Sequence, residues 1–469
     1  MGTVGINFGA LNSGTGFDVT ATVSSIMANL KAIEDPWTAQ IAKLTSQDTA
    51  FTSLGTDLAD LSKSLLALTD FQGVMASKLG SSSDTNVLSL GSAGPTAVAG
   101  SHTIVVSQLA QSSSKYSDFV GASDKLSGAL TIQVGTGDPV TIPAISGSSD
   151  TLATYAAAIN LAGIGVRASV VSDATGSRLS LISNLSGLAG QLTVSNGGTV
   201  PAGATPATAY GALTDITSGL TIGMHRGMDG QNAKLSVDGI FIETASNTVN
   251  SVIQGVSFQV LSADPSVSVN VQIVNDNSAV KSSFAGLVAA YNVVIKDIKS
   301  QEGKDSSGKP EPLYGNNVIS QIQSSLSLAL TSGAASGSVT SLYKLGISVN
   351  QDGTLLLDTA ALGAQLDSNY LDVAGFFQDS GSFGKGLLSA LDRLGNQSPV
   401  GAIALALKAG SSQEAILNEN ITVQDALIAD RKLSVTAQLT AANLILQAIP
   451  QRLDEVNQLY SALTGYNTK

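Results

Sequence analysis

Apolar residues recur at alternating steps of three and four near both ends of this 469-residue chain. Near the start they are Val19, Val23, Ile26, Leu30 and Ile33. Near the end they run from Val435 through Leu439, Ala442, Leu446, Ile449, Leu453, Val456, Tyr460 and Leu463. This spacing is the heptad pattern of helices that pack along one seam. The simplest way to bury both seams is to pair the two terminal helices.

The first helix has a clear beginning and a clear interruption. Asp18 is a suitable N-cap residue, and it follows the flexible Gly14-Thr15-Gly16 stretch. Pro36 interrupts the run, because an interior proline removes a hydrogen-bond donor and crowds the preceding turn. A second heptad run follows at Phe51, Leu54, Leu58, Leu61, Leu65 and Leu68. The first 70 or so residues are therefore predicted to be mostly helical.

The last helix is apolar over more than one seam. Leu444, Ile445 and Leu459 lie off the line that carries Leu446, Ile449 and Leu453. A stripe wider than a two-helix seam is buried against more than one neighbour, so the pattern favours packing between subunits. A helix lying on a membrane surface carries several Lys or Arg residues on its polar face, and here Arg452 stands alone. Pro450 is expected to bend this helix.

Between the terminal helices the hydrophobic period changes to that of strands. Strand patterns with turn residues between them occupy 101–110, 129–145, 164–172, 178–183, 233–244 and 256–274, with a helix at 151–161. Helical patterns return at 278–299, 315–331, 359–367, 383–395 and about 413–463, and 346–358 reads as a hairpin turning at Asn350–Gly353. The Gly/Ser/Thr-rich stretch 197–209 is predicted to be a surface loop.

Composition excludes several classes of function. The formal net charge is −12, and no cluster of Lys or Arg occurs, so the chain lacks the positive field that binds nucleic acid. It has no cysteine, which excludes disulfides, thiolate metal sites and cysteine nucleophiles. The N-terminal stretch has no basic region followed by an apolar one, so no cleaved secretory signal is expected. No run reaches the ~18 uninterrupted apolar residues of a membrane span.

The motifs that could carry chemistry all favour a plain structural interpretation. GSFGKG (381–386) has Gly386 where a phosphate-binding loop needs Ser or Thr. NQDGTLLLD (350–358) lacks the alternate ligands of a calcium loop. His102 is expected in a strand and His225 in a loop, neither with a partner at metal-ligand spacing. We predict no catalytic residues, no metal and no cofactor, although a pair of catalytic carboxylates is invisible in a sequence.

Four stretches resemble one known family, the flagellar filament cap or hook-associated protein 2 family. They are GTGFDVTATVSSIM (14–27), SHTIVVSQLAQSSSKYS (101–117), GQNAKLSVDGIFIETASNTVNSVIQGVSFQVL (230–261) and LYKLGISVNQDGTLLLDTAALGAQLDSNYLDVAGFF (342–377). The third is the most specific, with V-D-G, then S-N-x-[VI], then I-x-G-V. In the fourth, L-G-I and D-G-x-L precede a helix that ends in F-F. The ordered set resembles the family over almost the entire length.

The resemblance implies an α+β multidomain fold, in which a terminal coiled-coil leg carries two nested antiparallel β-rich heads. The expected parts are terminal leg helices (1–45 and 420–469), a helical leg domain with a β-hairpin (46–79 and 276–419), a β-rich head (80–125 and 222–275) and a second β-rich head inserted in the first (126–221).

The resemblance also implies a non-enzymatic function, namely an oligomeric cap at the filament tip that retains exported flagellin and promotes its folding and insertion. Its implied partners are copies of itself in a ring, expected as a pentamer or hexamer, flagellin, the hook–filament junction protein, and an export chaperone on the C-terminal helix. Neither nucleic acid nor membrane is among them. Export through the flagellum's own channel would explain an extracellular location without a cleaved signal.

The residues expected at the subunit and flagellin interface are those of the two terminal seams, Val19 to Ile33 and Leu439 to Leu463 as named above. Two alternatives stay open at this point. One is a surface adhesin that uses the Ser-, Thr- and Asn-rich heads, and the other is a hook–filament junction protein, which shares apolar terminal helices.

Overall fold

A computed structural model describes residues 16–121, 124–144, 150–195, 212–331, 337–395 and 397–464 of the chain. It divides into two compact units. One unit is Asp70–Val280, and the other combines Met1–Thr69 with Lys281–Lys469. The fold is α+β, as predicted, and every strand pair within the described ranges is antiparallel. The predicted loop at 197–209 and the first residues of the glycine-rich entry lie outside the described residues.

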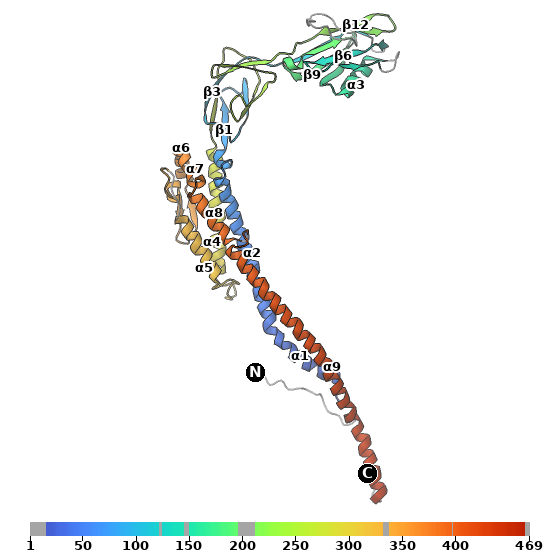
Figure 1. Ribbon diagram of the computed structural model, residues 1–469, viewed down its shortest axis with the longest axis vertical. Coiled ribbons are helices and arrows are strands. Elements are labelled where there is room, and N and C mark those ends of the chain that lie inside the picture. The colour runs from blue at the N-terminus through green and yellow to red at the C-terminus, as the bar shows by residue number, and fades with distance from the viewer. Residues whose placement is uncertain are drawn as a thin grey trace. The chain divides into compact units, whose positions relative to one another are not determined.

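The unit that contains both termini is helical (Figure 1). Its α-helices are α1 (Val19–Lys31), α2 (Asp35–Thr69), α4 (Asn277–Gln301), α5 (Asn317–Thr331), α6 (Thr359–Ser368), α7 (Tyr370–Gln378), α8 (Phe383–Leu394) and α9 (Ala402–Thr464). It also has the 3-10 turns η1 (Ala32–Glu34) and η4 (Leu342–Leu345), and a hairpin of β18 (Ile347–Val349) and β19 (Leu355–Leu357).

The N-terminal heptads form α1 and α2, with the break where it was predicted. α1 ends at Lys31, η1 follows, and α2 begins at Asp35, so that Pro36 lies in its first turn, where a missing N–H costs little. All six residues of the second heptad run are buried along α2: Phe51, Leu54, Leu58, Leu61, Leu65 and Leu68.

The other helices of this unit complete a core around α2. Phe284 of α4 meets Phe377 of α7 edge to face, with ring centroids 5.1 Å apart, and Phe376 stacks on Phe383 of α8 at 5.0 Å. Fully buried aromatic pairs of this kind hold helices in a fixed relation. The predicted helix ending in F-F and the hairpin at 346–358 are both confirmed.

Two helices differ from expectation. α9 begins at Ala402, about three turns before the predicted start, because Ile403, Gly410 and Leu417 already face the core. α4 is long and apolar enough to cross a membrane by length and composition alone, although the sequence showed no uninterrupted apolar run. Phe284, Leu287, Tyr291 and Ile298 of α4 are buried inside the helical unit, as in a core helix, while Val293 is half exposed.

The β-rich unit holds two separate cores. The first lies between a five-stranded sheet, in the order β1-β17-β3-β13-β14, and a three-stranded sheet, β15-β16-β2. These strands are β1 (Lys78–Ser82), β2 (Leu88–Ala93), β3 (Gly100–Gln108), β13 (Ala233–Val237), β14 (Ile240–Thr244), β15 (Thr248–Asn250), β16 (Val256–Val260) and β17 (Val269–Asn275), and the 3-10 turn η2 (Val74–Ala76) precedes them.

The V-D-G motif forms the turn of one hairpin in this first core. Asp238 and Gly239 both have positive φ, +51° and +83°, as a two-residue turn between β13 and β14 requires. Leu235 and Val237 of β13 point into the core with Ile104 and Val106 of β3, so alternate residues of each strand are buried.

The second core is formed by a six-stranded sheet, β5-β11-β12-β4-β9-β8, a three-stranded sheet, β10-β6-β7, and helix α3. Its elements are β4 (Ser112–Ser117), β5 (Leu126–Ser127), β6 (Leu130–Val134), β7 (Val140–Ile142), α3 (Leu152–Ala162), β8 (Val166–Asp173), β9 (Gly176–Ser186), η3 (Leu188–Gly190), β10 (Leu192–Ser195), β11 (Ala212–Asp215) and β12 (Thr221–Arg226). The predicted strand–helix–strand–strand block of 129–197 is present, with two differences: a hairpin, β6–β7, precedes α3, and β10 follows β9.

The four-part division proposed from the sequence stays a prediction. The β-rich unit begins at Asp70 and ends at Val280, and within it β4 at Ser112–Ser117 already pairs with strands of the second core. Sequence to either side of the second core contributes to the first core, so the second is inserted in the first along the chain.

Candidate assembly interface

The N-terminal helix is anchored on the C-terminal helix. The Asp18 carboxylate accepts a hydrogen bond from the Ala21 backbone N–H at 2.9 Å, which caps α1 as predicted. The backbone N–H of Phe17 donates to Oδ1 of Asn443 at 2.8 Å, and Lys31 lies 3.3 Å from the Asp425 carboxylate. These contacts fix the two helices in an antiparallel arrangement (Figure 1).

A small apolar core lies between the two helices. Val23 and Met27 of α1 and Val435 of α9 are buried, with Val19, Ile26, Leu30, Ile428 and Leu439 packed against them. The two predicted seams are thus brought together over this stretch. Ile33 is different, because it lies in η1 and its side chain is 51% exposed.

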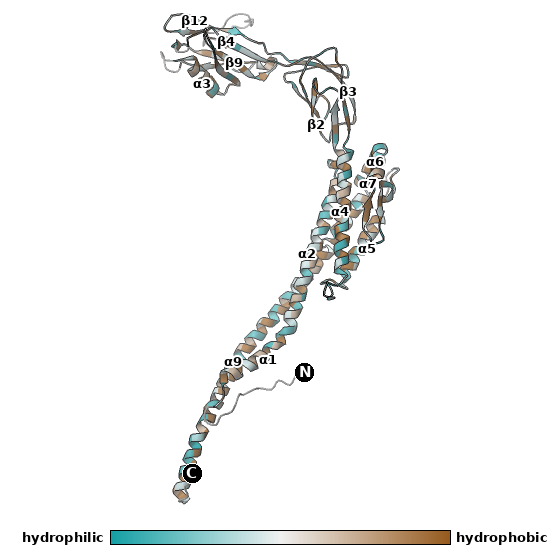
Figure 2. Ribbon diagram, turned by 180° about the vertical axis from the view of Figure 1, so that it is seen from behind, coloured by the Kyte–Doolittle hydropathy of each residue, from teal (hydrophilic) through white to brown (hydrophobic). Residues whose placement is uncertain are grey.

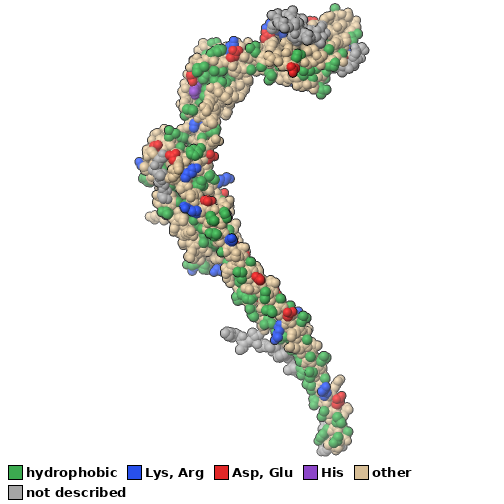
Figure 3. Space-filling model, viewed as in Figure 1, with side chains coloured by type: hydrophobic (Ala, Val, Ile, Leu, Met, Phe, Trp, Pro, Cys, Tyr) green, Lys and Arg blue, Asp and Glu red, His purple; other side chains and the backbone are tan. Residues whose placement is uncertain are grey.

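Beyond Asn443 the same face of α9 is exposed. The exposed fractions are 42% for Ile449, 56% for Leu453, 59% for Val456, 55% for Tyr460 and 84% for Leu463. Their spacing continues that of Val435 and Leu439, so they lie on the face that α1 covers further up the helix. We call residues 444–464 of α9 the distal stretch. Figure 2 shows hydrophobic residues along α9 to its C-terminal end, and Figure 3 shows hydrophobic side chains at the surface there.

The distal stretch is suited to burial in an assembly. It spans about 30 Å at ~1.5 Å per residue, and its charged side chains are Arg452, Asp454 and Glu455. Burying a Leu, Ile or Val side chain completely is worth about 1.5–3 kcal/mol. Leu446 is half-buried, and Ala442 is exposed but small. Leu444, Ile445 and Leu459, which lie off the seam, are each more than 60% exposed.

Pro450 lies inside α9, which continues through it to Thr464. Proline has no N–H, so the helix lacks one backbone hydrogen bond in the turn that precedes it. The distal stretch therefore combines a missing backbone hydrogen bond with exposed apolar side chains.

The two histidines each pair with one aspartate. Nδ1 of His102 lies 2.7 Å from Oδ2 of Asp238, and Nε2 of His225 lies 2.5 Å from Oδ1 of Asp118. No group of three or more potential ligands occurs in the ranges that the structure describes. His225 was predicted to lie in a loop, and this prediction is wrong. The residue lies in β12, where it pairs with Tyr116 of β4.

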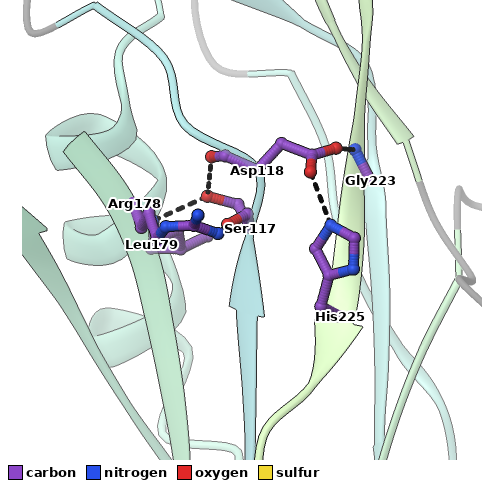
Figure 4. A network of polar contacts seen from close by, with 6 residues as sticks. All are labelled: Ser117, Asp118, Arg178, Leu179, Gly223 and His225. Carbon is purple, nitrogen blue, oxygen red and sulfur yellow. Dashed lines mark hydrogen bonds and ion pairs between the residues drawn. The ribbon is translucent and has the colours of Figure 1, made fainter. Parts of the chain in front are cut away.

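The network around His225 is structural (Figure 4). Burial alone would raise the pKa of Asp118, but hydrogen bonds from His225 and the Gly223 N–H outweigh it and hold the pKa below its usual value. The Ser117 hydroxyl is buried, donates to the Asp118 carbonyl oxygen and accepts from the Leu179 N–H. The hydrogen bond from the Leu179 N–H ties β4 to β9.

The two loop motifs also have structural roles. In GSFGKG, Gly381 has φ +73° and Ser382 caps α8 by accepting from the Lys385 N–H, so the motif starts a helix. In NQDG, Asp352 accepts hydrogen bonds from the N–H and hydroxyl of Thr354, which closes the β18–β19 turn.

Sequence reasoning missed two contacts between residues that are distant in the chain. Asn443 is a polar residue in the middle of an apolar run, and that was the available signal for its contact with Phe17. Asp57 of α2 and Asp297 of α4 lie together, both partly buried, and burial followed by their mutual repulsion raises the pKa of Asp57. Burial also raises the pKa of Asp297. Nothing in the sequence pairs these two carboxyl groups.

Two sheet-built cores, a helical unit and an exposed apolar helix end are typical of a structural assembly protein. Comparison with known families agrees with this class. The model described as flagellar hook-associated protein 2 C-terminus matches residues 230–462, and the model described as flagellar hook-associated protein 2 N-terminus matches residues 15–113. This chain belongs to the flagellar hook-associated protein 2 family, the FliD family of flagellar cap proteins.

Individual relatives match over most of their length. The chain is 29% identical over 461 residues to the B-type flagellar hook-associated protein 2 of Pseudomonas aeruginosa, covering 91% of both chains. It is 29% identical over 377 residues to the flagellar hook-associated protein 2 of Escherichia coli K12, covering 76% of this chain and 77% of that one. The protein is accordingly a flagellar one.

A solved structure supports the same assignment. The D1-D2-D3 domains of the flagellar cap protein FliD from Escherichia coli superpose with a TM-score of 0.61 at 26% sequence identity. The match covers 77% of this chain and 99% of that one.

Proposed function

We propose that this chain forms a ring-shaped oligomeric cap at the tip of the flagellar filament. There it retains exported flagellin and promotes its folding and its insertion at the growing end. The observation that carries the proposal is the distal stretch of α9, which continues a seam that is buried against α1 higher up the helix yet leaves Leu453 and Val456 more than half exposed. A contiguous exposed apolar face of this kind marks a site that other molecules cover.

Two kinds of neighbour can cover the terminal seams, namely copies of this chain and the apolar terminal helices of flagellin. Before assembly, an export chaperone on the C-terminal helix would shield the same residues. Contact with the hook–filament junction protein is proposed for the stage at which the filament begins. Ordering side chains at each contact costs conformational entropy, which the apolar burial must exceed.

Localisation follows from the same proposal. The protein would leave the cell through the flagellar secretion channel without a cleaved signal and remain outside at the filament tip. Because capping consists of binding and positioning, the proposal includes no catalytic step and no cofactor.

Complementation of a strain lacking its own cap protein tests the proposal. Leu453→Asp places a charge on the seam, and Gln458→Asp places the same charge on the opposite face of the same helix as a matched control. We expect Leu453→Asp cells to release flagellin into the medium and to lack long filaments, with the Gln458→Asp cells unaffected. Circular dichroism of both purified variants checks that the fold is kept. Normal filaments with Leu453→Asp would contradict the proposal.

A further inference from the structure

The side of β4 that faces the second core is polar. Ser113, Lys115 and Ser117 alternate along the strand, and all three are buried, with exposed fractions of 0%, 8% and 0%. On the two neighbouring strands, Lys115 lies opposite Leu181 of β9 and Arg226 of β12. Leu181 is fully buried in the second core. Lys115 therefore lies beside apolar side chains on one strand and beside another cation on the other.

Lys115 has no anionic partner in the part of the chain that the structure describes. Its amine makes no ion pair or hydrogen bond there. Opposite residues of an antiparallel pair have Cβ atoms about 4.5–5.5 Å apart, and like charges at such a position are destabilising. Burial, followed by the charge of Arg226, lowers the pKa of the Lys115 amine. Because a lysine is seldom buried without a partner, this position lacks a negative charge.

Arg226 already has a partner, and that partner is not enough for both cations. Its guanidinium is paired with the carboxylate of Asp229, which also accepts a hydrogen bond from Nε2 of Gln191 at 3.3 Å. One carboxylate offsets one of the two positive charges and leaves the other. The side chain of Arg226 is 46% exposed, so this end of the strand pair is open to solvent. An ion from solution can therefore reach the two cations.

Ser113 adds an unsatisfied hydroxyl on the same side of β4. Its Oγ is buried and has no hydrogen-bond partner among the residues that the structure describes. Ser117, further along the strand, has two partners, the Asp118 carbonyl oxygen and the Leu179 N–H. Buried hydroxyls are normally satisfied in this way. The Cα atoms of Ser113 and Lys115 are about 7 Å apart, because each strand residue advances the chain by ~3.3 Å. A hydroxyl donor and an ammonium donor thus leave the strand side by side.

We propose that Lys115, Arg226 and Ser113 bind a small oxyanion of the phosphate or sulfate class at this end of the second core. Ammonium and guanidinium groups bind such anions through charge-assisted hydrogen bonds, and the serine hydroxyl donates a further one. The ligand is a free ion, because Lys115 and Ser113 lie below the surface. The bound anion would remove the repulsion between β4 and β12 and stabilise the second core. This inference is independent of the proposed capping function.

Binding of inorganic phosphate to the full-length protein tests the proposal. Lys115→Met keeps the unbranched stem and removes the charge, and Lys125→Met removes an exposed lysine near the same core as a matched control. The ³¹P resonance of phosphate should broaden with the native protein and with Lys125→Met. Lys115→Met should weaken the affinity about tenfold or more, which corresponds to the loss of one charged hydrogen bond. Ser113→Ala and Arg226→Gln should each weaken it several-fold.

Thermal unfolding gives a second readout, because a ligand that binds the native state raises Tm. In sodium chloride, Lys115→Met should be at least as stable as the native protein, since it removes an uncompensated charge. In sodium phosphate of equal ionic strength the order should reverse. Circular dichroism checks that each variant keeps its fold.

Two results would overturn the proposal. One is an equal response to phosphate in the native protein and in Lys115→Met, with Ser113→Ala and Arg226→Gln also unchanged. The other is a crystal structure grown in phosphate in which a water molecule, and no anion, lies between Lys115 and Ser113. Tighter binding of a phosphoserine peptide than of free phosphate would contradict the choice of a free ion as the ligand.

Discussion

Helix α9 has two parts that carry similar apolar residues on the seam. The seam is buried in the first part and exposed in the second. From Ala402 to Asn443 the seam is covered, with Leu417 and Val435 buried against α2 and α1. From Leu444 to Thr464 the seam continues in the same register, and Leu453 and Val456 are exposed. Periodicity therefore identifies the face of a helix that will be buried. Whether the covering surface comes from the same chain or from another molecule depends on where the partner segment ends.

The largest expected difference comes from one charge placed in each part. Val435→Asp puts a carboxylate into the small core with Val23 and Met27, and should destabilise the α1–α9 pair by about 3 kcal/mol or more. Leu453→Asp should leave the stability of the monomer unchanged, because its side chain is already in water. Hydrogen exchange of residues 19–31 measures both effects. Equal effects of the two substitutions would remove the distinction between the parts.

The second test of this comparison concerns Pro450, which lies in the distal stretch of α9. Pro450→Ala restores an N–H donor and should stabilise the helix around residues 446–454 by about 2–3 kcal/mol. Slower amide exchange of that segment in the monomer is the expected result, with no change between residues 402 and 440. Exchange that stays the same would mean that the proline does not weaken the distal stretch.

The boundary between the two parts depends on Asn443. Asn443→Ala removes the acceptor of the Phe17 N–H and should cost about 1 kcal/mol, felt as faster exchange in the first turn of α1. Gln438→Ala, on the exposed part of the same helix, is the matched control and should have a negligible effect. Comparable losses in the two variants would argue against Asn443 as the anchor.

The smallest expected effect concerns the partly buried carboxyl groups of Asp57 and Asp297 in the helical unit. Folding raises the pKa of Asp57 and of Asp297 above the unfolded value of 3.8, chiefly by burial. The stability linked to this pair is present below the unfolded pKa and lost as pH rises through the folded pKa. Asp297→Asn should therefore raise stability at pH 7 by about 0.5 kcal/mol, after allowing for solvent screening.

Thermal melts at two pH values check this prediction. The gain from Asp297→Asn should shrink as pH falls toward 3.8, and the exposed Asp392→Asn should give no gain at either pH. A gain that is independent of pH would assign the effect to packing instead of to charge.

Much of the secondary structure could be predicted from the sequence, because the spacing of apolar residues along a short segment indicates a helix or a strand. Phe51 to Leu68 and Phe284 to Ile298 carry helical spacing, and the Asp238-Gly239 and Asp352-Gly353 turns mark hairpins. These signals need only neighbouring residues to be interpreted. The seam between α1 and α9 was predicted in the same way, from spacing alone, and its role in assembly stays a proposal.

What the sequence did not reveal depends on contacts between distant segments. The strand order β1-β17-β3-β13-β14 joins residues almost 200 positions apart. Arg178 lies over the ring of Phe119 at 3.5 Å, and His225 stacks on Tyr116, because three strands meet there. The position of His225 was predicted wrongly because it too depends on distant strands. The segment TIGMHR (221–226) has too few apolar residues to indicate a strand by its own pattern.

Hydrogen exchange along α9, measured in the free monomer and in the assembled protein, tests the central claim most directly. The account predicts slow exchange from residue 402 to 443 in both states. Amides from 444 to 464 should exchange fast in the monomer and become protected only on assembly. Protection of residues 444–464 in the isolated monomer would contradict the account, because it would show that the chain covers this apolar face by itself.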